Sequence, residues 1–384
     1  MPPSAAYRNP VLKALSSLWL TLVCMSLLMV LVVACTLLQV PLGTHEAVVR
    51  TIHSFIVWWR PEGASFKVPV FPGGALVGLV LLLNLIFAQF LRLELSRRKA
   101  GLWIAHLGLA LLFVGEFTTG MFQVESQMPI KVGQTSDYSE DYRLMELAVM
   151  DRTDPKTDTV TAIPESILRK GGEIKTPSLP FTLRVLHYYP NSVLGMRGAG
   201  DPPAEATAGI GPNLSVRPAP RVTQDDEADS AAALVEVDDG GKDLGRYWLS
   251  NALGAPQGFT LEGRTWRLAL RPRRYYLPYT LTLEQFHHDV YPGTDIPKNF
   301  SSLVRLKDPA RGEDRDVLIH MNAPLRYAGK TFYQASFGQG DTLSVFQVVQ
   351  NPGWTIPYIS CVLVALGLLL HFWLKLSASF GRSP

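Results

Sequence analysis

The sequence predicts a membrane protein in which four transmembrane α-helices carry one large β-rich extracytoplasmic domain, folded as a sandwich or an open barrel. Three observations support this class. Of the 384 residues, 47% are hydrophobic and only 18% are charged, whereas soluble domains carry about 25% charged residues. Long uncharged runs occur near the two ends of the chain, and the middle is polar. The middle also contains short segments that alternate between apolar and polar residues, as half-buried strands do.

Four apolar runs are long enough to cross a hydrocarbon core of roughly 30 Å at 1.5 Å per residue. They cover residues 18–40, 73–91, 101–122 and about 357–376. The first run has a cationic start and could also be a cleaved signal peptide ending near Cys35, although its apolar stretch continues past that cysteine. The second run contains Asn84 and Gln89, which we expect to hydrogen-bond between helices.

The distribution of arginine and lysine predicts the orientation of the helices. Cationic residues precede the first run, fill the short connection between the second and third, and follow the fourth; they are Arg8, Lys13, Arg92, Arg97, Arg98, Lys99, Lys375 and Arg382. Positive charge accumulates on the cytoplasmic side, so both termini are expected there, in the inner (plasma) membrane. The predicted regions are a three-helix membrane region (1–122), an extracytoplasmic domain (123–353), and a final helix with a short cytoplasmic tail (354–384).

The extracytoplasmic region is predicted to consist of strands separated by turns rich in Gly, Pro and Asp. The candidate strands are 143–150, 181–189, 265–271, 279–286, 301–307, 316–321, 330–336 and 342–349. Residues 191–231 are rich in Gly, Pro and Ala, which predicts a long loop or a flexible insert.

This region contains none of the common catalytic motifs, such as GxSxG, HExxH or a phosphate-binding glycine loop. His287 and His288 are adjacent, and neighbouring strand residues point to opposite faces, so they are not expected to bind one metal together. The run from Arg271 to Tyr276 is basic and aromatic. It could receive an anionic partner, or it could be an ordinary solvated strand. The net charge of +3 does not indicate a nucleic-acid partner.

Two histidines within the apolar runs are the main functional candidates, because ionisable residues inside a membrane span are costly. His106 lies five residues into the third run, and His371 lies four residues before Lys375 at the end of the fourth. Counting along each helix places both in the cytoplasmic leaflet at similar depth. Neutral imidazole is a good ligand for haem iron. The alternatives are a hydrogen bond to a neighbouring helix or a side chain that reaches the interface. Glu116, ten residues after His106, could relay protons or reach the outer interface.

Two segments of the domain resemble those of the ResB (CcsB) family of System II cytochrome c biogenesis proteins. Residues 319–336, IHMNAPLRYAGKTFYQAS, are similar to a family signature of the form MNxPLxYxGxxFYQxS. Residues 291–302, YPGTDIPKNFSS, resemble the segment before the family's central strands, and Asn351-Pro-Gly353 also fits. The order of three helices, a β-rich domain and a closing helix is similar as well.

The resemblance implies that the protein handles haem. Proteins of this family work with a CcsA-type membrane subunit whose tryptophan-rich WWD segment binds haem, and together they deliver haem across the membrane to apocytochrome c. By position, the family's cytoplasmic-side histidine falls on His106, which would be an axial ligand of haem b as a transient cargo. His371 has no such match. This sequence contains no WWD segment, so the resemblance implies an accessory subunit of a haem lyase complex and no catalytic residue of its own.

Three functions therefore remain open from the sequence. The first is a haem-delivery subunit of a cytochrome c maturation complex. The second is a membrane-anchored scaffold that docks apocytochrome or partner subunits without binding haem. The third is a b-type electron-transfer subunit in which His106 and His371 bind one haem.

Overall fold

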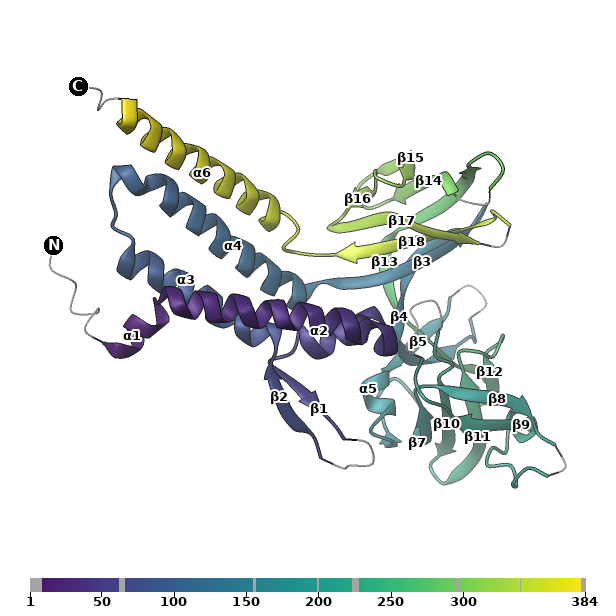
Figure 1. Cartoon of the computed structure of the whole chain (residues 1–384). Coiled ribbons are helices and arrows are strands. Elements are labelled where there is room, and N and C mark those ends of the chain that lie inside the picture. The colour runs from purple at the N-terminus through teal and green to yellow at the C-terminus, as the bar shows by residue number, and fades with distance from the viewer. Residues whose placement is uncertain are drawn as a thin grey trace. The chain divides into compact units, whose positions relative to one another are not determined.

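The computed structural model describes residues 9–61, 66–154, 157–198, 200–222, 228–294, 297–338 and 340–380. The chain forms two compact units (Figure 1). One unit is helical and combines the segments before Glu125 and after Gln350. The other is built mainly from strands and consists of Glu125–Val222 and Asp226–Gln350.

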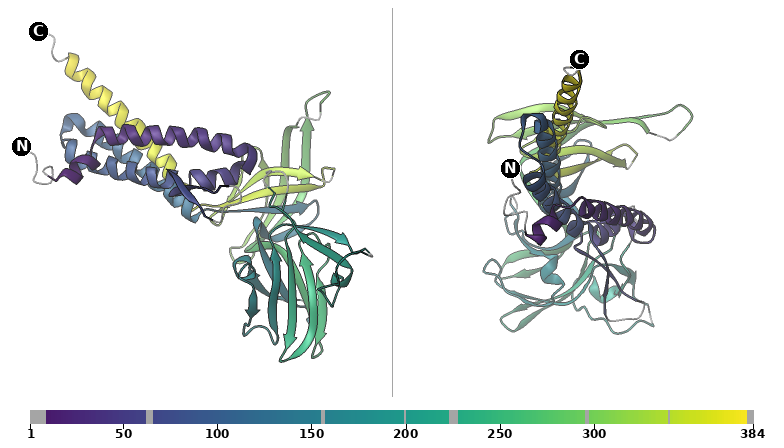
Figure 2. Two further views of the ribbon diagram at one scale, coloured as in Figure 1. Left: turned by 60° about the horizontal axis from the view of Figure 1, so that its bottom comes forward. Right: turned by 60° about the vertical axis from the view of Figure 1, so that its left-hand side comes forward.

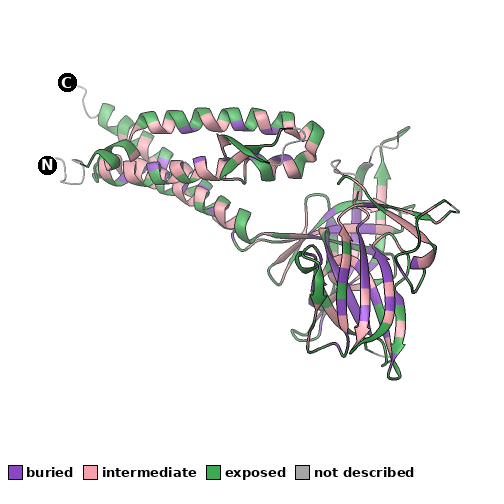
Figure 3. Cartoon of the chain, turned by 90° about the horizontal axis from the view of Figure 1, so that it is seen from below, coloured by how far each residue is buried: buried purple, intermediate pink, exposed green. Residues whose placement is uncertain are grey.

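Among its described residues, the helical unit contains four helices that are long and apolar enough to cross a membrane, as the sequence predicts. They are α2 (Leu18–Thr51), α3 (Gly74–Arg92), α4 (Ala100–Phe122) with the preceding 3₁₀ turn η2 (Arg97–Lys99), and α6 (Ile356–Phe380). A short helix α1 (Pro10–Leu15) precedes them. Large apolar side chains on these helices are exposed, including Val40 at 89% and Trp19 at 78% (Figure 3). Such surfaces fit a lipid environment.

Helix α2 extends beyond the predicted run because it consists of two helices joined at a break. Gly43 has φ +72° and ψ 163°, which is not a helical conformation, and Pro41 lies just before it. Glycine adopts positive φ at little cost, so the chain can turn here and start a second helical stretch at residue 44. An ion pair between Glu46 and Arg50 (2.6 Å) lies on this stretch.

Polar side chains of α3 fasten the neighbouring helices. The amide of Asn84 accepts a hydrogen bond from the Thr21 hydroxyl (2.7 Å) and donates one to the Leu15 carbonyl (2.6 Å), across the break between α1 and α2. The amide of Gln89 donates to the Trp103 carbonyl in α4 (3.2 Å). The expectation that Asn84 and Gln89 hydrogen-bond between helices is confirmed.

A two-stranded hairpin that the sequence did not predict connects α2 to α3. Its strands are β1 (Ile56–Trp59) and β2 (Val68–Pro72), which pair antiparallel. Val57 and Phe71 pack against the apolar cluster between α2 and α3.

The second unit contains three sheets. Its elements are β3 (Val124–Lys131), β4 (Thr135–Asp151), β5 (Thr159–Pro164), α5 (Glu165–Leu168), β6 (Gly172–Ile174), β7 (Thr182–Tyr189), β8 (Ser192–Met196), η3 (Gly211–Asn213), β9 (Leu214–Pro218), β10 (Ala232–Asp239), β11 (Lys242–Ser250), β12 (Gln257–Leu261), β13 (Arg264–Val290), β14 (Pro297–Asp308), β15 (Glu313–His320), β16 (Leu325–Tyr327), β17 (Lys330–Gly338) and β18 (Leu343–Gln350). A ten-stranded sheet has the order β15-β14-β13-β4-β3-β18-β17-β16, with β12 and β5 added to β13 and β4. A four-stranded sheet has the order β11-β10-β7-β6, and β8 pairs with β9.

These sheets enclose two cores, which define two lobes (Figure 2). In the sandwich lobe, the four-stranded sheet packs on β4, β5, β12 and the first part of β13 around Leu147, Leu183, Val235 and Leu268. In the barrel lobe, the rest of the large sheet curls around Leu281, Phe332 and Phe346. The bridge between His320 and Ala323 connects the two ends of this path, so the barrel is nearly closed. The unit thus combines the two predicted alternatives, a sandwich and an open barrel.

The structure corrects two details of the strand prediction. The predicted strands 265–271 and 279–286 are parts of one long strand, β13, which runs through both lobes. Within residues 191–231, which the composition predicted to be a loop, β8 and β9 form an antiparallel pair. Their pairing is stabilised by backbone hydrogen bonds, which a composition rich in Gly and Pro does not reveal.

Candidate functional site: the paired helices α4 and α6

Helices α4 and α6 pack with their backbones in contact through glycines. Gly101, Gly108 and Gly115 recur every seven residues along α4, and each lies against α6. A Cβ atom on Gly108 would lie only 2.9 Å from the Ser360 carbonyl oxygen, and one on Gly367 would lie 2.7 Å from the Gly101 carbonyl oxygen. Small residues allow this close approach between membrane helices. We call these four residues the glycine seam.

The end of α4 is also fastened to the segment that leads into α6. The amide of Asn351 donates to the Thr119 hydroxyl and to the Gln123 side-chain oxygen, both at 3.1 Å. Its own side-chain oxygen accepts from the backbone of Gly353 (2.8 Å). The Asn-Pro-Gly segment therefore holds the start of α6 beside the end of α4.

His106 is poised to use one ring nitrogen as a ligand. Its Nδ1 lies 2.7 Å from the Leu102 carbonyl oxygen, one turn earlier in α4. A carbonyl only accepts hydrogen bonds, so in the neutral ring Nδ1 carries the proton and Nε2 carries the free lone pair. This arrangement, with the second nitrogen held by a backbone carbonyl, orients and fixes the tautomer of a metal-binding histidine.

His106 is turned away from the glycine seam. It follows Ala105, a buried residue that Gly367 touches, and one helical residue corresponds to a rotation of about 100°. His106 lies instead on the face of α4 that also carries Trp103 and Phe113, which are three residues before it and seven residues after it. Both of these face α3 and its neighbours, through the Gln89 hydrogen bond and the α2–α3 apolar cluster.

His371 occupies a different position. Its backbone lies directly against Gly101, and its ring lies 5.8 Å from the Phe372 ring between centroids. The Nδ1 atom of His371 is buried and has no hydrogen-bond partner among the described residues.

The structure therefore brings together the helices that carry the two histidines, but it does not place their imidazoles on a common face. His371 is level with Gly101, and His106 lies five residues further along α4, about 7.5 Å on. The two side chains are in the same half of the helix pair and are offset by more than one turn.

The other sequence candidates have ordinary surroundings. Glu116 is exposed on α4. His287 is exposed with its Nε2 3.3 Å from the Gln285 oxygen, whereas His288 is largely buried with its Nδ1 3.2 Å from Asp341. Within the described residues, no three His, Cys, Asp or Glu side chains gather closely enough to hold a metal ion.

Two of the three arginines in the basic and aromatic run of β13 pair with acidic residues of β4. Arg271 pairs with Glu146 (3.0 Å) in a nearly buried ion pair, and Arg274 pairs with Glu140 (2.9 Å). The run lies where the register between β13 and β4 shifts, between the two lobes. Arg271 and Arg274 therefore help to join the two lobes, whereas Arg273 is exposed beside the Tyr275 ring, and the binding of an anionic partner at this run stays a prediction.

Two polar clusters in the barrel lobe involve residues of the sequence signature. The Gln334 side chain forms a buried triangle with Ser302 and Ser344, through contacts of 2.6, 2.8 and 2.9 Å. The Tyr327 hydroxyl donates to the buried Asp308 carboxylate (2.8 Å). These two signature residues therefore contribute to the internal packing of the barrel lobe.

Asp308 is a strongly stabilised carboxylate. Burial alone would raise its pKa, but the hydrogen bond from Tyr327, the backbone amides of Ala310 and Arg311, and the Arg311 charge together hold the pKa of Asp308 below its ordinary value. The Arg311 guanidinium also lies 5.6 Å from the centroid of the Tyr327 ring.

Sequence reasoning missed the glycine seam and the buried polar clusters. The seven-residue spacing of Gly101, Gly108 and Gly115 was visible in the sequence and is a signal of close helix packing. The polar triangle joins residues from three strands, so no local pattern could have identified it.

Comparison with known proteins finds a family similarity for part of the strand-built unit. A model of the ResB-like family matches residues 262–345, which include β13 to β17 and the start of β18. Protein NrfI of Wolinella succinogenes is 34% identical to this chain over 102 residues, which are 27% of this chain and 11% of that protein. The chain thus spans about a ninth of the length of this relative. His106 and His371 both lie outside the family match.

The four candidate spans among the described residues and the strand-built unit define a membrane protein with a β domain, and residues 262–345 of that domain match the ResB-like family. Over these matched residues the chain is similar to proteins of the ResB-like family.

Proposed function

We propose that this chain is a membrane subunit of a System II cytochrome c maturation complex that helps deliver haem to apocytochrome c. The observation that carries the proposal is a histidine with a fixed tautomer and a free Nε2 in a membrane helix, in a chain whose barrel lobe is of ResB type. The partners would be a CcsA-type WWD subunit, apocytochrome c and the lipid bilayer.

His106 would hold haem b as a cargo through Nε2 as one axial ligand. The hydrogen bond from Nδ1 to the Leu102 carbonyl supports this role, because it orients the ring and leaves the lone pair of Nε2 available. Haem supplies the iron and the vinyl groups that react with the thiols of apocytochrome. The chain would bind, orient and protect the haem, and no residue of this chain is assigned a catalytic role.

We assign the haem to His106 without His371 as its second ligand. Gly101 meets the backbone of His371 and Gly367 meets that of Ala105, so a porphyrin ring cannot enter between α4 and α6 at this level without separating them. The close packing argues against the electron-transfer alternative with both histidines on one haem.

The proposed orientation places the β unit on the periplasmic side of the plasma membrane. Its support is the cationic connection between α3 and α4, where Arg92, Arg97, Arg98 and Lys99 lie. This side is where the haem would meet apocytochrome c.

A second candidate function is a membrane-anchored scaffold that binds no haem itself. The family match favours it in one respect, because the match covers much of the barrel lobe and excludes both membrane histidines. In that case, the barrel lobe would dock apocytochrome or a partner subunit, and the partner would bind the haem.

A reduced-minus-oxidised absorption spectrum of the detergent-purified complex tests the proposal. The wild type is compared with His106→Ala, with and without added imidazole, and His371→Ala is the matched control from the same helix pair. We expect His106→Ala alone to lose the haem bands and imidazole to restore them. Unchanged bands in His106→Ala would support the scaffold function, and equal loss in both variants would support electron transfer.

A further inference from the structure

The β1–β2 hairpin exposes large apolar side chains on both of its faces. The exposed residues and their exposed fractions are Phe55 57%, Trp58 52%, Trp59 57%, Phe66 61% and Val70 56%. Trp58 and Trp59 are adjacent in β1, so they point to opposite faces. A two-stranded sheet in water is marginally stable at best, and an apolar surface of this kind marks an interaction site.

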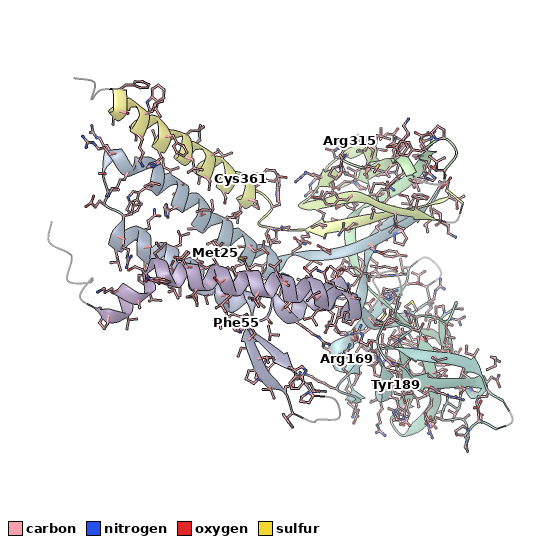
Figure 4. The ribbon with its side chains drawn as sticks, in the orientation of Figure 1. Met25, Phe55, Arg169, Tyr189, Arg315 and Cys361 are labelled. Atoms are coloured by element: carbon pink, nitrogen blue, oxygen red, sulfur yellow. The ribbon has the colours of Figure 1, made fainter. Side chains whose placement is uncertain are left out.

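The base of the hairpin is fixed to the helices. The Gly73 amide donates to the Phe55 carbonyl (2.9 Å), and Gly74 lies so close to Ile52 that a Cβ atom would approach its carbonyl oxygen to 2.5 Å. Val57 and Phe71 fill the apolar cluster between α2 and α3. Phe55 marks the point where the chain leaves α2 to enter β1 (Figure 4). The hairpin therefore leaves the helices at a defined level.

The length of α3 indicates where the base of the hairpin lies relative to the two membrane boundaries. Arg92, at one end of α3, is bonded to Ser16 (3.3 Å) beside the break between α1 and α2, where charged residues mark one membrane boundary. Gly74 begins α3 18 residues earlier, which corresponds to about 27 Å. This distance is close to the roughly 30 Å thickness of a hydrocarbon core. The base of the hairpin therefore lies at the opposite boundary.

Charged groups near the hairpin fit the same boundary. The exposed Glu46–Arg50 ion pair lies on the helical stretch just before it. Trp59 pairs with Val68, so the exposed Arg60 and Lys67 follow directly at the far side of this pair. Such cations near a membrane surface are attracted to lipid phosphates.

We propose that the β1–β2 hairpin lies in the interfacial layer of the bilayer, at the boundary where α3 begins. Trp58, Trp59 and Phe66 contact the lipid at headgroup depth, as aromatic residues in membrane belts do. Arg60 and Lys67 contact the headgroup phosphates. The hairpin is thus an interfacial anchor that fixes the depth of the helices in the membrane, and this role does not depend on haem.

Site-directed spin labelling of the full chain in phospholipid nanodiscs tests the anchor. A nitroxide is placed at Val70→Cys or at Trp59→Cys in a Cys361→Ser background, and its collisions with oxygen and with a water-soluble nickel chelate are compared. Lys242→Cys, an exposed position at the start of β11, is the aqueous control, and Leu369→Cys, 66% exposed on α6, is the lipid control. We expect the ratio of oxygen to nickel collisions at both hairpin positions to lie several-fold above the ratio at Lys242→Cys.

Ratios equal to that of Lys242→Cys would overturn the proposal. The proposal would also fail if both hairpin positions had water-like collision ratios in nanodiscs but were shielded from the nickel chelate in native membranes. A protein, and not lipid, would then cover the hairpin. A second measurement avoids dependence on the labelled variants. Lipids brominated near the headgroup should quench the tryptophan fluorescence of the unlabelled chain less after Trp58→Phe and Trp59→Phe are introduced, and equal quenching would contradict the proposal.

Discussion

Gly101 in α4 lies against the backbone of His371 in α6, so closely that a side chain on Gly101 would overlap the His371 amide nitrogen. The histidine that appeared from the sequence to face His106 is therefore part of the helix contact itself. This contact leaves no space between the two helix backbones at the level of Gly101, and it supports our proposal that the two histidines do not share one haem.

The glycine seam predicts that alanine lowers the melting temperature at Gly101 but not at Gly120, although both positions are in α4. Gly101→Ala should lower the melting temperature of the purified protein, because overpacking costs about 1–3 kcal/mol. Gly120→Ala is the matched control, since a Cβ atom there meets nothing within 4 Å. It should leave the melting temperature unchanged or raise it slightly. Melting is followed by circular dichroism in detergent, and equal effects of the two substitutions would argue against close helix contact.

The buried nitrogen of His371 predicts that an apolar ring is tolerated at this position. An unpaired buried polar group costs about 1–3 kcal/mol, and Nδ1 of His371 has no partner among the described residues. His371→Phe should therefore keep or raise the melting temperature and retain the haem bands, whereas His106→Phe should lose them. Loss of the bands in His371→Phe would show that His371 is a ligand.

The polar triangle predicts that Gln334→Leu destabilises the strand-built unit. The substitution leaves the buried hydroxyls of Ser302 and Ser344 without their amide partner, at a cost of about 1–3 kcal/mol. Gln350→Leu is the control, because that side chain is exposed. Urea unfolding followed by near-UV circular dichroism should show a lower midpoint for Gln334→Leu alone, and equal midpoints would mean that the triangle contributes nothing.

The environment of Asp308 predicts a pH-dependent contribution to stability. Its pKa in the folded protein lies below the ordinary value, which is about 3.9. The contribution is therefore fully present above about pH 4 and is lost as the pH falls through the folded pKa. Asp308→Asn should lower the urea midpoint at pH 7, and the difference from wild type should shrink below about pH 4. A difference that is constant with pH would rule out the ionised carboxylate as its source.

The membrane helices could be predicted from the sequence because hydropathy and length are local properties. The position of His106 along α4 followed from counting residues, but the direction of its side chain did not, because that depends on which face of α4 meets α6. The spacing of Gly101, Gly108 and Gly115 contains that information, and it becomes interpretable once the partner helix is known.

The sequence predicted that the second unit is built from strands, but it predicted less well where individual strands begin, end and join. Alternation revealed most strands of the barrel lobe, but Pro272 and the arginines near it concealed the continuity of β13. The buried strands of the sandwich lobe, such as β10 with Val235 and Val237, carry too few polar residues for clear alternation. Burial on both faces removes the period-two signal.

The place of β3 beside β18 in the large sheet has a consequence for the order of synthesis. These are the first and last strands of the unit, so the ribosome must synthesise every strand of the unit before β18 can pair with β3. The residues that follow β18 lead directly into α6, which then pairs with α4, a helix that has been synthesised much earlier. Premature termination anywhere before residue 350 would leave both an open sheet edge and an unpaired row of glycines, two surfaces that quality-control proteases and chaperones can recognise.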